Sequence, residues 1–121
     1  MSDLQDLAER YLATWNETDP AARRRLVDEV WAEDGSYTDP LVAAEGRDAI
    51  DATLGAVQAQ FPGLVFTLGG AVDAHHDIAR FTWELGPQGA EALVVGFDVL
   101  VADAGGRIKQ VHGFLDKVPS A

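Results

Sequence analysis

Residues 78–116 decide the fold, and their sequence is IARFTWELGPQGAEALVVGFDVLVADAGGRIKQVHGFLD. Apolar side chains alternate with polar or small ones through three segments, Ile78 to Leu85, Glu91 to Asp103 and Arg107 to Asp116. This period of two is typical of β-strands that bury one face. The gaps between the segments are short and rich in turn residues, which favours antiparallel neighbours.

The chain before these strands carries three helical patterns. Apolar residues recur at steps of three and four from Leu4 to Trp15, from Pro20 to Trp31 and from Ile50 to Phe61. Asp19 is placed to cap the second helix, and Pro62-Gly63 is a stop signal for the third. We therefore expect three helices ahead of the sheet.

The remaining segments predict a short extended piece and one more strand. Ser36-Tyr37-Thr38 leads into Asp39-Pro40, where proline disfavours helix at the residue before it. Leu64 to Asp73 has a strand pattern, and Gly69-Gly70 inside it marks a bend. The order of elements predicts one α+β domain over residues 1–121, in which a curved, mainly antiparallel sheet buries one face against the helices.

The composition excludes several classes of function. The chain has 121 residues, no cysteine and a formal net charge of −11, so thiol chemistry is excluded and nucleic-acid binding is disfavoured. No apolar run approaches the roughly 20 residues that a membrane-spanning helix needs. The segment from Met1 to Arg10 is acidic and polar, unlike a secretory signal. We expect a cytoplasmic protein without a membrane partner.

Asp98 is the strongest candidate for a functional residue. It is the one charge on a strand face that otherwise carries Ala92, Val94, Gly96 and Leu100. Burial among apolar neighbours raises the pKa of a carboxyl, and a protonated carboxyl can donate a hydrogen bond to a developing oxyanion. The alternatives are that Asp98 faces water, pairs with Arg80 or another base, or caps a bulge beside Gly96.

Other polar residues have ordinary structural interpretations. Asp39 before proline is typical of a turn that bonds its own backbone, and Tyr11 on a helix stripe is typical of core. His75-His76 predict a polar hairpin, because adjacent side chains diverge too far to share a metal. His112 fits a packed or interface residue better than a catalytic base. We expect no metal site.

A family resemblance adds weight to these residues. The chain resembles the superfamily of nuclear transport factor 2, ketosteroid isomerase and the SnoaL-like polyketide cyclases over nearly its whole length. The resemblance implies a cone-shaped, cystatin-like domain. It rests on Glu9-Arg10-Tyr11-Leu12-Ala13, Tyr37-Thr38-Asp39-Pro40, Gly46-Arg47-Asp48-Ala49-Ile50, Gly96-Phe97-Asp98 and Gly105-Gly106-Arg107-Ile108.

The resemblance to ketosteroid isomerase implies a set of roles. Asp39 would be the general base, and Tyr11 and protonated Asp98 would be the two oxyanion donors. This set moves a proton next to the carbonyl of an apolar substrate without cofactor or metal. The substrate pocket would be lined by Trp15, Leu54, Phe81, Trp83 and Val111.

Two further functions stay open. A SnoaL-like polyketide cyclase would use an acidic residue near the position of Asp98 to assist an aldol closure. A non-catalytic carrier would need an apolar pocket but no carboxylate chemistry. With any of these functions we expect a homodimer through the outer sheet face, which includes Phe97, His112 and Phe114.

Overall fold

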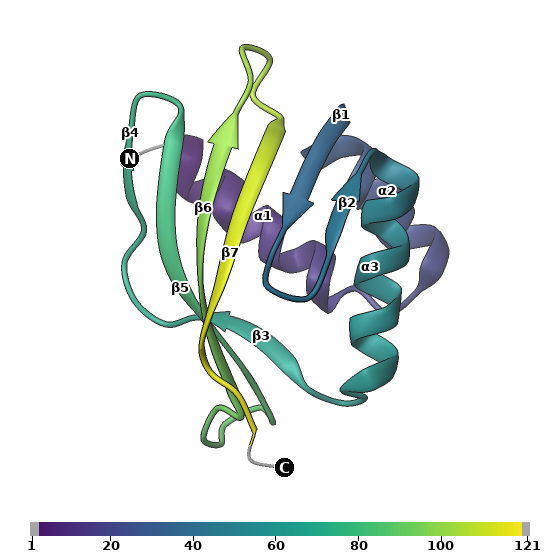
Figure 1. Cartoon of the computed structure of the whole chain (residues 1–121), viewed down its shortest axis with the longest axis vertical. Coiled ribbons are helices and arrows are strands. Elements are labelled where there is room, and N and C mark those ends of the chain that lie inside the picture. Colours follow the sequence, from purple (N-terminus) through teal and green to yellow (C-terminus); the bar gives the residue numbers. More distant parts are fainter. Residues whose placement is uncertain (1–2, 120–121) are drawn as a thin grey trace.

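The computed structural model describes residues 3–119, which form three helices and seven strands (Figure 1). None of the three helices is long and apolar enough to span a bilayer. The elements are α1 (Asp3–Asn16), α2 (Pro20–Val30), β1 (Trp31–Thr38), β2 (Ala43–Glu45), α3 (Arg47–Gln60), β3 (Val65–Leu68), β4 (Asp73–His75), β5 (Ile78–Gly86), β6 (Val94–Ala102) and β7 (Ile108–Lys117).

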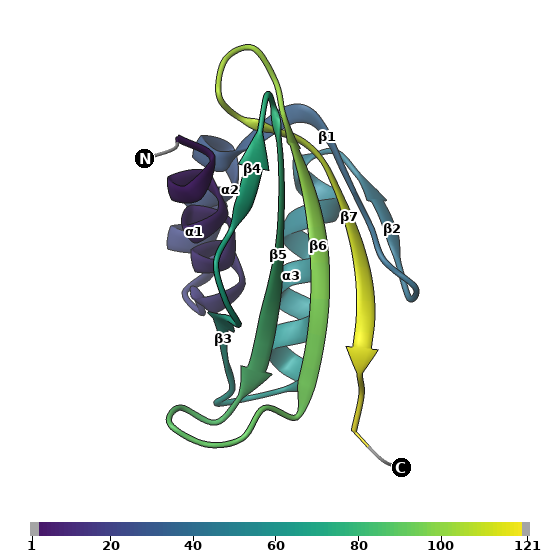
Figure 2. The same cartoon turned by 90° about the vertical axis from the view of Figure 1, so that its left-hand side faces the viewer.

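The strands form a single curved sheet with the helices on its concave side (Figure 2). The strand order is β2-β1-β7-β6-β5-β3, with β4 also paired to β5. All pairings are antiparallel except the parallel pairing of β1 with β7. The predicted α+β domain, with a mainly antiparallel sheet wrapped around three helices, is confirmed.

The strand registers bring distant carboxylates into one row. Asp98 on β6 lies between Phe81 on β5 and Gly113 on β7. Thr38, the last residue of β1, pairs with His112 on β7. Asp39 follows Thr38 directly, so it reaches the position beside Gly113. Two residues 59 positions apart in the sequence thus approach the same glycine.

The first helix is fixed across the open end of the sheet by a reciprocal side-chain clamp. The Asn16 amide nitrogen donates to the Phe66 carbonyl at 2.9 Å, and the Phe66 N–H donates to the Asn16 side-chain oxygen at 2.8 Å. Phe66 lies on β3, so the clamp ties α1 to the sheet edge. The buried stripe of α1, which includes Tyr11 and Trp15, consequently faces the concave side of the sheet.

Three element boundaries differ from those expected. The second helix ends at Val30, and β1 begins at Trp31, whereas the sequence predicted a strand only from Ser36. The reason is non-local, because Trp31 pairs with Ile108 of β7. The predicted strand Leu64 to Asp73 is a strand only over β3, and β4 begins at its last residue and continues to His75. The short β2 was not predicted.

Candidate active site

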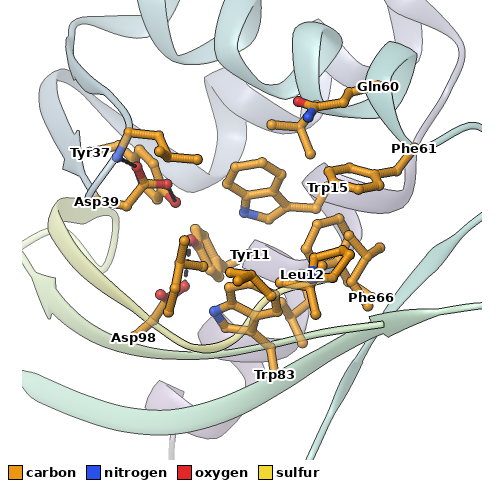
Figure 3. A pocket seen from close by; sticks show the side chains of 17 residues that line it. Tyr11, Leu12, Trp15, Tyr37, Asp39, Gln60, Phe61, Phe66, Trp83 and Asp98 are labelled. Atoms are coloured by element: carbon orange, nitrogen blue, oxygen red, sulfur yellow. Dashed lines mark hydrogen bonds between the residues drawn. The ribbon is translucent and has the colours of Figure 1, made fainter. Parts of the chain in front are cut away.

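The concave side of the sheet holds a cavity of about 220 Å³, whose lining includes Gln60 and Phe61 at the end of α3 (Figure 3). Side chains from α1, α3 and five strands line it. Both carboxylates singled out by the sequence, Asp39 and Asp98, are among them. The aromatic walls are Tyr11, Trp15, Tyr37, Phe61, Phe66 and Trp83.

Asp98 lies deep in the cavity and has one satisfied and one unsatisfied oxygen. Its side chain is on the concave face of β6, and the residue is 2% exposed. Oδ2 accepts a hydrogen bond from the Tyr11 hydroxyl at 2.8 Å. Oδ1 is buried and has no hydrogen-bond partner among residues 3–119. A buried polar atom without a partner is uncommon and points to a ligand or a functional role.

The surroundings of Asp98 raise its pKa to about 6. Burial is the largest cause, because a low-dielectric environment disfavours the charged form. The hydrogen bond from Tyr11 and the nearby Trp83 side chain, which makes no hydrogen bond to Oδ1 in this geometry, act in the opposite direction, and the negative charge of Asp39 raises the pKa further. A carboxyl with this pKa is present in both protonation states near neutral pH.

Tyr11 stands behind Asp98 and does not point freely into the cavity. Its ring is 1% exposed and packs edge-on against Phe81, with ring centroids 5.9 Å apart. Burial, followed by the charge of Asp98, raises the pKa of Tyr11, so the hydroxyl stays protonated. Its single proton is donated to Asp98. The structure therefore places Tyr11 where it can act on a ligand through Asp98.

Asp39 is held by three hydrogen bonds at the rim of the same cavity. Oδ1 accepts from the backbone N–H groups of Leu41 at 2.8 Å and Val42 at 3.0 Å, which confirms the predicted turn. Oδ2 accepts from the Tyr37 hydroxyl at 2.7 Å. A carboxylate oxygen has two lone-pair sites, so Oδ2 keeps one for a substrate proton.

The sequence analysis missed Tyr37 as part of the site. Residues two apart on a strand share a face, so Tyr37 and Asp39 at the end of β1 point to the same side. That spacing was the available signal. The ring of Tyr37 also packs against Trp15, with centroids 5.5 Å apart.

Gly113 leaves the space in which the two carboxylates meet. A Cβ atom at this position would lie 2.9 Å from Asp98 Oδ1 and 3.3 Å from the Asp39 Cβ. It would also lie 3.5 Å from the Tyr37 hydroxyl oxygen. The absence of a side chain at residue 113 therefore lets both carboxylates pack close to the backbone of β7, and any larger residue would displace Asp98.

The predicted lining residues divide into two groups. Trp15 and Trp83 line the cavity. Leu54, Phe81 and Val111 do not, so the expectation for these three is corrected. Leu54, Phe81 and Val111 are packed in the core at 2%, 2% and 1% exposure, and the ring of Tyr11 lies against Phe81. The cavity is also lined by residues that the sequence analysis did not assign to it, namely Val57, Phe61, Phe66, Leu115 and Val118.

The two neighbouring histidines lie outside the cavity. His75 ends β4 and His76 follows it in the left-handed region at φ 52°. Their rings meet edge-on, with centroids 5.5 Å apart. Among residues 3–119, no three side chains of the metal-binding types form a group that could hold an ion.

Comparison with known proteins identifies the family. The model of the SnoaL-like domain matches residues 8–111. The chain belongs to the SnoaL-like family. This SnoaL-like domain is 41% identical in sequence to a candidate isomerase of the same family from Agrobacterium tumefaciens. The structural match covers 96% of this chain and 99% of that chain, with a TM-score of 0.91. No curated protein sequence matches it.

More distant structures share the fold. A candidate polyketide cyclase from Sinorhizobium meliloti is 15% identical, with 93% of this chain and 99% of that chain covered and a TM-score of 0.71. A protein related to nuclear transport factor 2 from Cytophaga hutchinsonii is 11% identical, with 96% and 91% covered and a TM-score of 0.70. The SnoaL-like domain thus has the fold of the superfamily that its sequence motifs indicated.

Proposed function

We propose that this SnoaL-like domain is a cofactor-independent enzyme that transfers a proton next to the carbonyl group of an apolar substrate. The observation that carries the proposal is the meeting of two differently held carboxylates in one apolar cavity. Asp39 accepts three hydrogen bonds at the rim, whereas Asp98 is buried with an unsatisfied oxygen. Pairs of titratable groups in contrasting environments are a mark of acid–base sites.

Asp39 acts as the general base. Its Oδ2 lone pair takes a proton from the carbon beside the substrate carbonyl, so the C–H electrons form a C=C bond and the negative charge moves to the oxygen. The protonated Asp39 then returns the proton to the same carbon or to a conjugated one. Return to a different carbon is an isomerisation, with no net gain or loss of atoms. The hydrogen bonds from Tyr37, Leu41 and Val42 keep the carboxylate in one orientation.

Asp98 acts as the hydrogen-bond donor to the enolate oxygen. In its protonated form, Oδ1 carries the proton and faces the space beside Gly113, while Oδ2 still accepts the hydrogen bond from Tyr11. A donor fixed in a water-poor cavity stabilises the developing charge more strongly than water does. Tyr11 is a positioning residue in this scheme, since it acts through Asp98.

A second candidate is an aldol cyclase, and the pKa of Asp98 favours it. A carboxyl with a pKa of about 6 is itself suited to give and take protons near neutral pH. In that case Asp98 would be the base or acid of a ring closure, and its replacement by asparagine would abolish activity. A carrier without catalysis would bind ligand equally well with asparagine at positions 39 and 98.

The proposed function is tested by deuterium exchange into a panel of neutral ketones with one to four rings, including a β,γ-unsaturated ketosteroid. We expect the parent protein to catalyse uptake of deuterium at the carbon beside the carbonyl, and Asp39→Asn to abolish it. Asp34→Asn is the matched control, because Asp34 is an exposed carboxylate outside the cavity. No exchange above the buffer rate in any ketone would contradict the proposal.

We also propose that the protein is a homodimer through the outer face of the sheet. Phe97 and Phe114 are opposite each other in register, and Phe114 is 55% exposed, beside the exposed His112. Multi-angle light scattering is expected to give twice the chain mass, and Phe114→Glu is expected to give the monomer mass. Ala21→Glu, on an exposed position of α2, should remain dimeric. A monomeric parent protein at micromolar concentration would contradict the dimer.

A further inference from the structure

We infer that the substrate is a neutral ketone or aldehyde with a compact apolar body of one or two rings, bound with its oxygen at Asp98 Oδ1. This inference rests on the proposed function and adds the chemical class of the substrate to it. Three independent features of the cavity support it, namely its volume, its charge and its single unsatisfied buried oxygen.

The volume of the cavity sets the size of the substrate. At about 220 Å³ it exceeds the roughly 150 Å³ cavity that encloses a benzene molecule, and it is smaller than the roughly 300–1,000 Å³ pockets of drug-sized ligands. One or two rings therefore fill it. A four-ring skeleton would extend past the mouth, where Leu41 is 83% exposed and Val118 57% exposed.

The charges around the cavity exclude an anionic substrate. No lysine, arginine or histidine of the described part of the chain lines it, whereas Asp39 and Asp98 both do. The whole chain carries a formal net charge of −11, which adds to the repulsion of anions. A carboxylate or phosphate bound here would lose its hydration without gaining a counter-charge, which is costly in an apolar site.

The hydrogen-bonding capacity of Asp98 in the cavity favours a carbonyl over an amine. Within residues 3–119, Asp98 Oδ1 is the one buried side-chain atom of the cavity without a partner. A carbonyl oxygen needs a single donor there, and protonated Asp98 supplies it. A primary ammonium brings three N–H donors, and even if Asp98 Oδ1 and the remaining lone pair of Asp39 Oδ2 accept two of them, the third stays unpaired among the aromatic side chains.

Gly113 keeps Asp98 Oδ1 in the position from which it meets the carbonyl oxygen. A Cβ atom at residue 113 would lie 2.9 Å from Asp98 Oδ1 and 3.3 Å from the Asp39 Cβ, so a methyl group there would displace Asp98. A carbonyl oxygen that accepts a hydrogen bond from Oδ1 brings its neighbouring carbon toward the proposed base, because Asp39 borders the same glycine.

The test is isothermal titration calorimetry with four probes at pH 5.5, where a carboxyl with a pKa of about 6 is mostly protonated. Three share a two-ring skeleton and differ in charge: 2-tetralone, the 2-aminotetralin cation and the tetralin-2-carboxylate anion. The fourth is a neutral four-ring ketosteroid. We expect 2-tetralone to bind at least about tenfold more tightly than the amine and the acid, since one unpaired buried donor or charge costs about this much. We also expect it to bind more tightly than the steroid, whose rings would extend past the mouth of the cavity. Tighter binding of the amine, the acid or the steroid would overturn the inference.

A substitution at Gly113 tests whether the ligand depends on the position of Asp98. Gly113→Ala is expected to weaken 2-tetralone binding by about tenfold or more, because the added methyl group displaces Asp98 Oδ1 and overpacking has effects of this size. Gly70→Ala is the matched control, since a Cβ there would have no neighbour within 4 Å, and its affinity should equal that of the parent. Circular dichroism of both variants verifies folding. Unchanged affinity in folded Gly113→Ala would refute the placement of the oxygen.

Binding and catalysis fail separately in these experiments. If 2-tetralone binds selectively but gains no deuterium, the proton-transfer function fails and the ligand class stands. If only the ketosteroid binds and exchanges, the function stands and the inference about size fails.

Discussion

The two carboxylates of the cavity have nearly opposite surroundings, although both come from strands that flank β7, β1 on one side and β6 on the other. Asp39 is half-buried at the rim, and all three hydrogen bonds given to it favour an oriented carboxylate. Asp98 is 2% exposed, with one hydrogen bond from Tyr11 and one unsatisfied oxygen. The difference teaches that the local environment can give the same side chain two different chemical roles.

The largest effect is expected when the negative charge of Asp39 at the rim is removed. Asp39→Asn keeps the shape of the side chain but cannot accept a substrate proton, so the exchange rate is expected to fall by about 10²–10⁴-fold. Deuterium uptake into the best ketone, measured by mass spectrometry, checks this. A rate within a few-fold of the Asp34→Asn control would show that Asp39 is not the base.

Removing the buried carboxyl is expected to have the next largest effect. Asp98→Ala deletes the donor to the enolate oxygen, so kcat should fall by about 10²–10³-fold. The thermal unfolding curve of the variant serves as the control for folding. A normal kcat in a folded Asp98→Ala protein would show that the oxygen is stabilised by another group.

The pH dependence of stability tests the burial of Asp98 without any substrate. The folded-state pKa of about 6 is above the usual value of 3.8, so the folded protein holds this proton more tightly than the unfolded chain does. The stability contribution is therefore complete below pH 3.8 and is lost as the pH rises toward 6. Asparagine does not ionise, so the Asp98→Asn variant does not lose stability in this pH range.

The quantity of interest is the free energy of unfolding of Asp98→Asn minus that of the parent. We expect this difference to be larger at pH 8 than at pH 4, by up to about 3 kcal/mol. Urea denaturation at the two pH values measures the change. The same difference between variant and parent at pH 4 and pH 8 would show that Asp98 titrates normally.

The smallest effect is expected from substitution of Tyr11, which lies behind Asp98. The hydrogen bond from Tyr11 lowers the pKa of Asp98, so Tyr11→Phe should raise it and move the alkaline limb of kcat/KM upward by about one pH unit. Asp39, Tyr11 and Tyr37 are the titratable groups that interact with Asp98. If Tyr11 only fills space, the rate will change while the limb stays at the same pH.

Much of the fold was predictable because its signals are local. The alternation in β5 to β7 and the helical stripes of α1 and α3 depend on side-chain spacing alone, and the strands lie within two or three residues of their predicted bounds. The stretch from Trp31 to Gly35 was predicted incorrectly because it becomes a strand only by pairing with β7. That partner lies more than 70 residues further along the chain.

The site was predictable only in part for the same reason. Asp98 stood out as a lone charge on an apolar face, and Asp39 and Tyr11 followed from the family motifs. The role of Gly113 depends on how β6, β7 and the end of β1 meet, which no local pattern shows. Phe81 was misplaced because a strand face does not reveal that the ring of Tyr11 covers it.

The most direct test of two roles for two carboxylates is the pH–rate profile of Asp98→Asn beside the parent. In the parent, kcat/KM for deuterium exchange is expected to fall as the pH rises above about 6, since Asp98 loses the proton that it donates. Asparagine can accept from Tyr11 and still donate an N–H at any pH. The account predicts that Asp98→Asn stays active with a flat profile up to pH 8. A variant as inactive as Asp39→Asn at every pH would contradict it and make Asp98 the acid–base group.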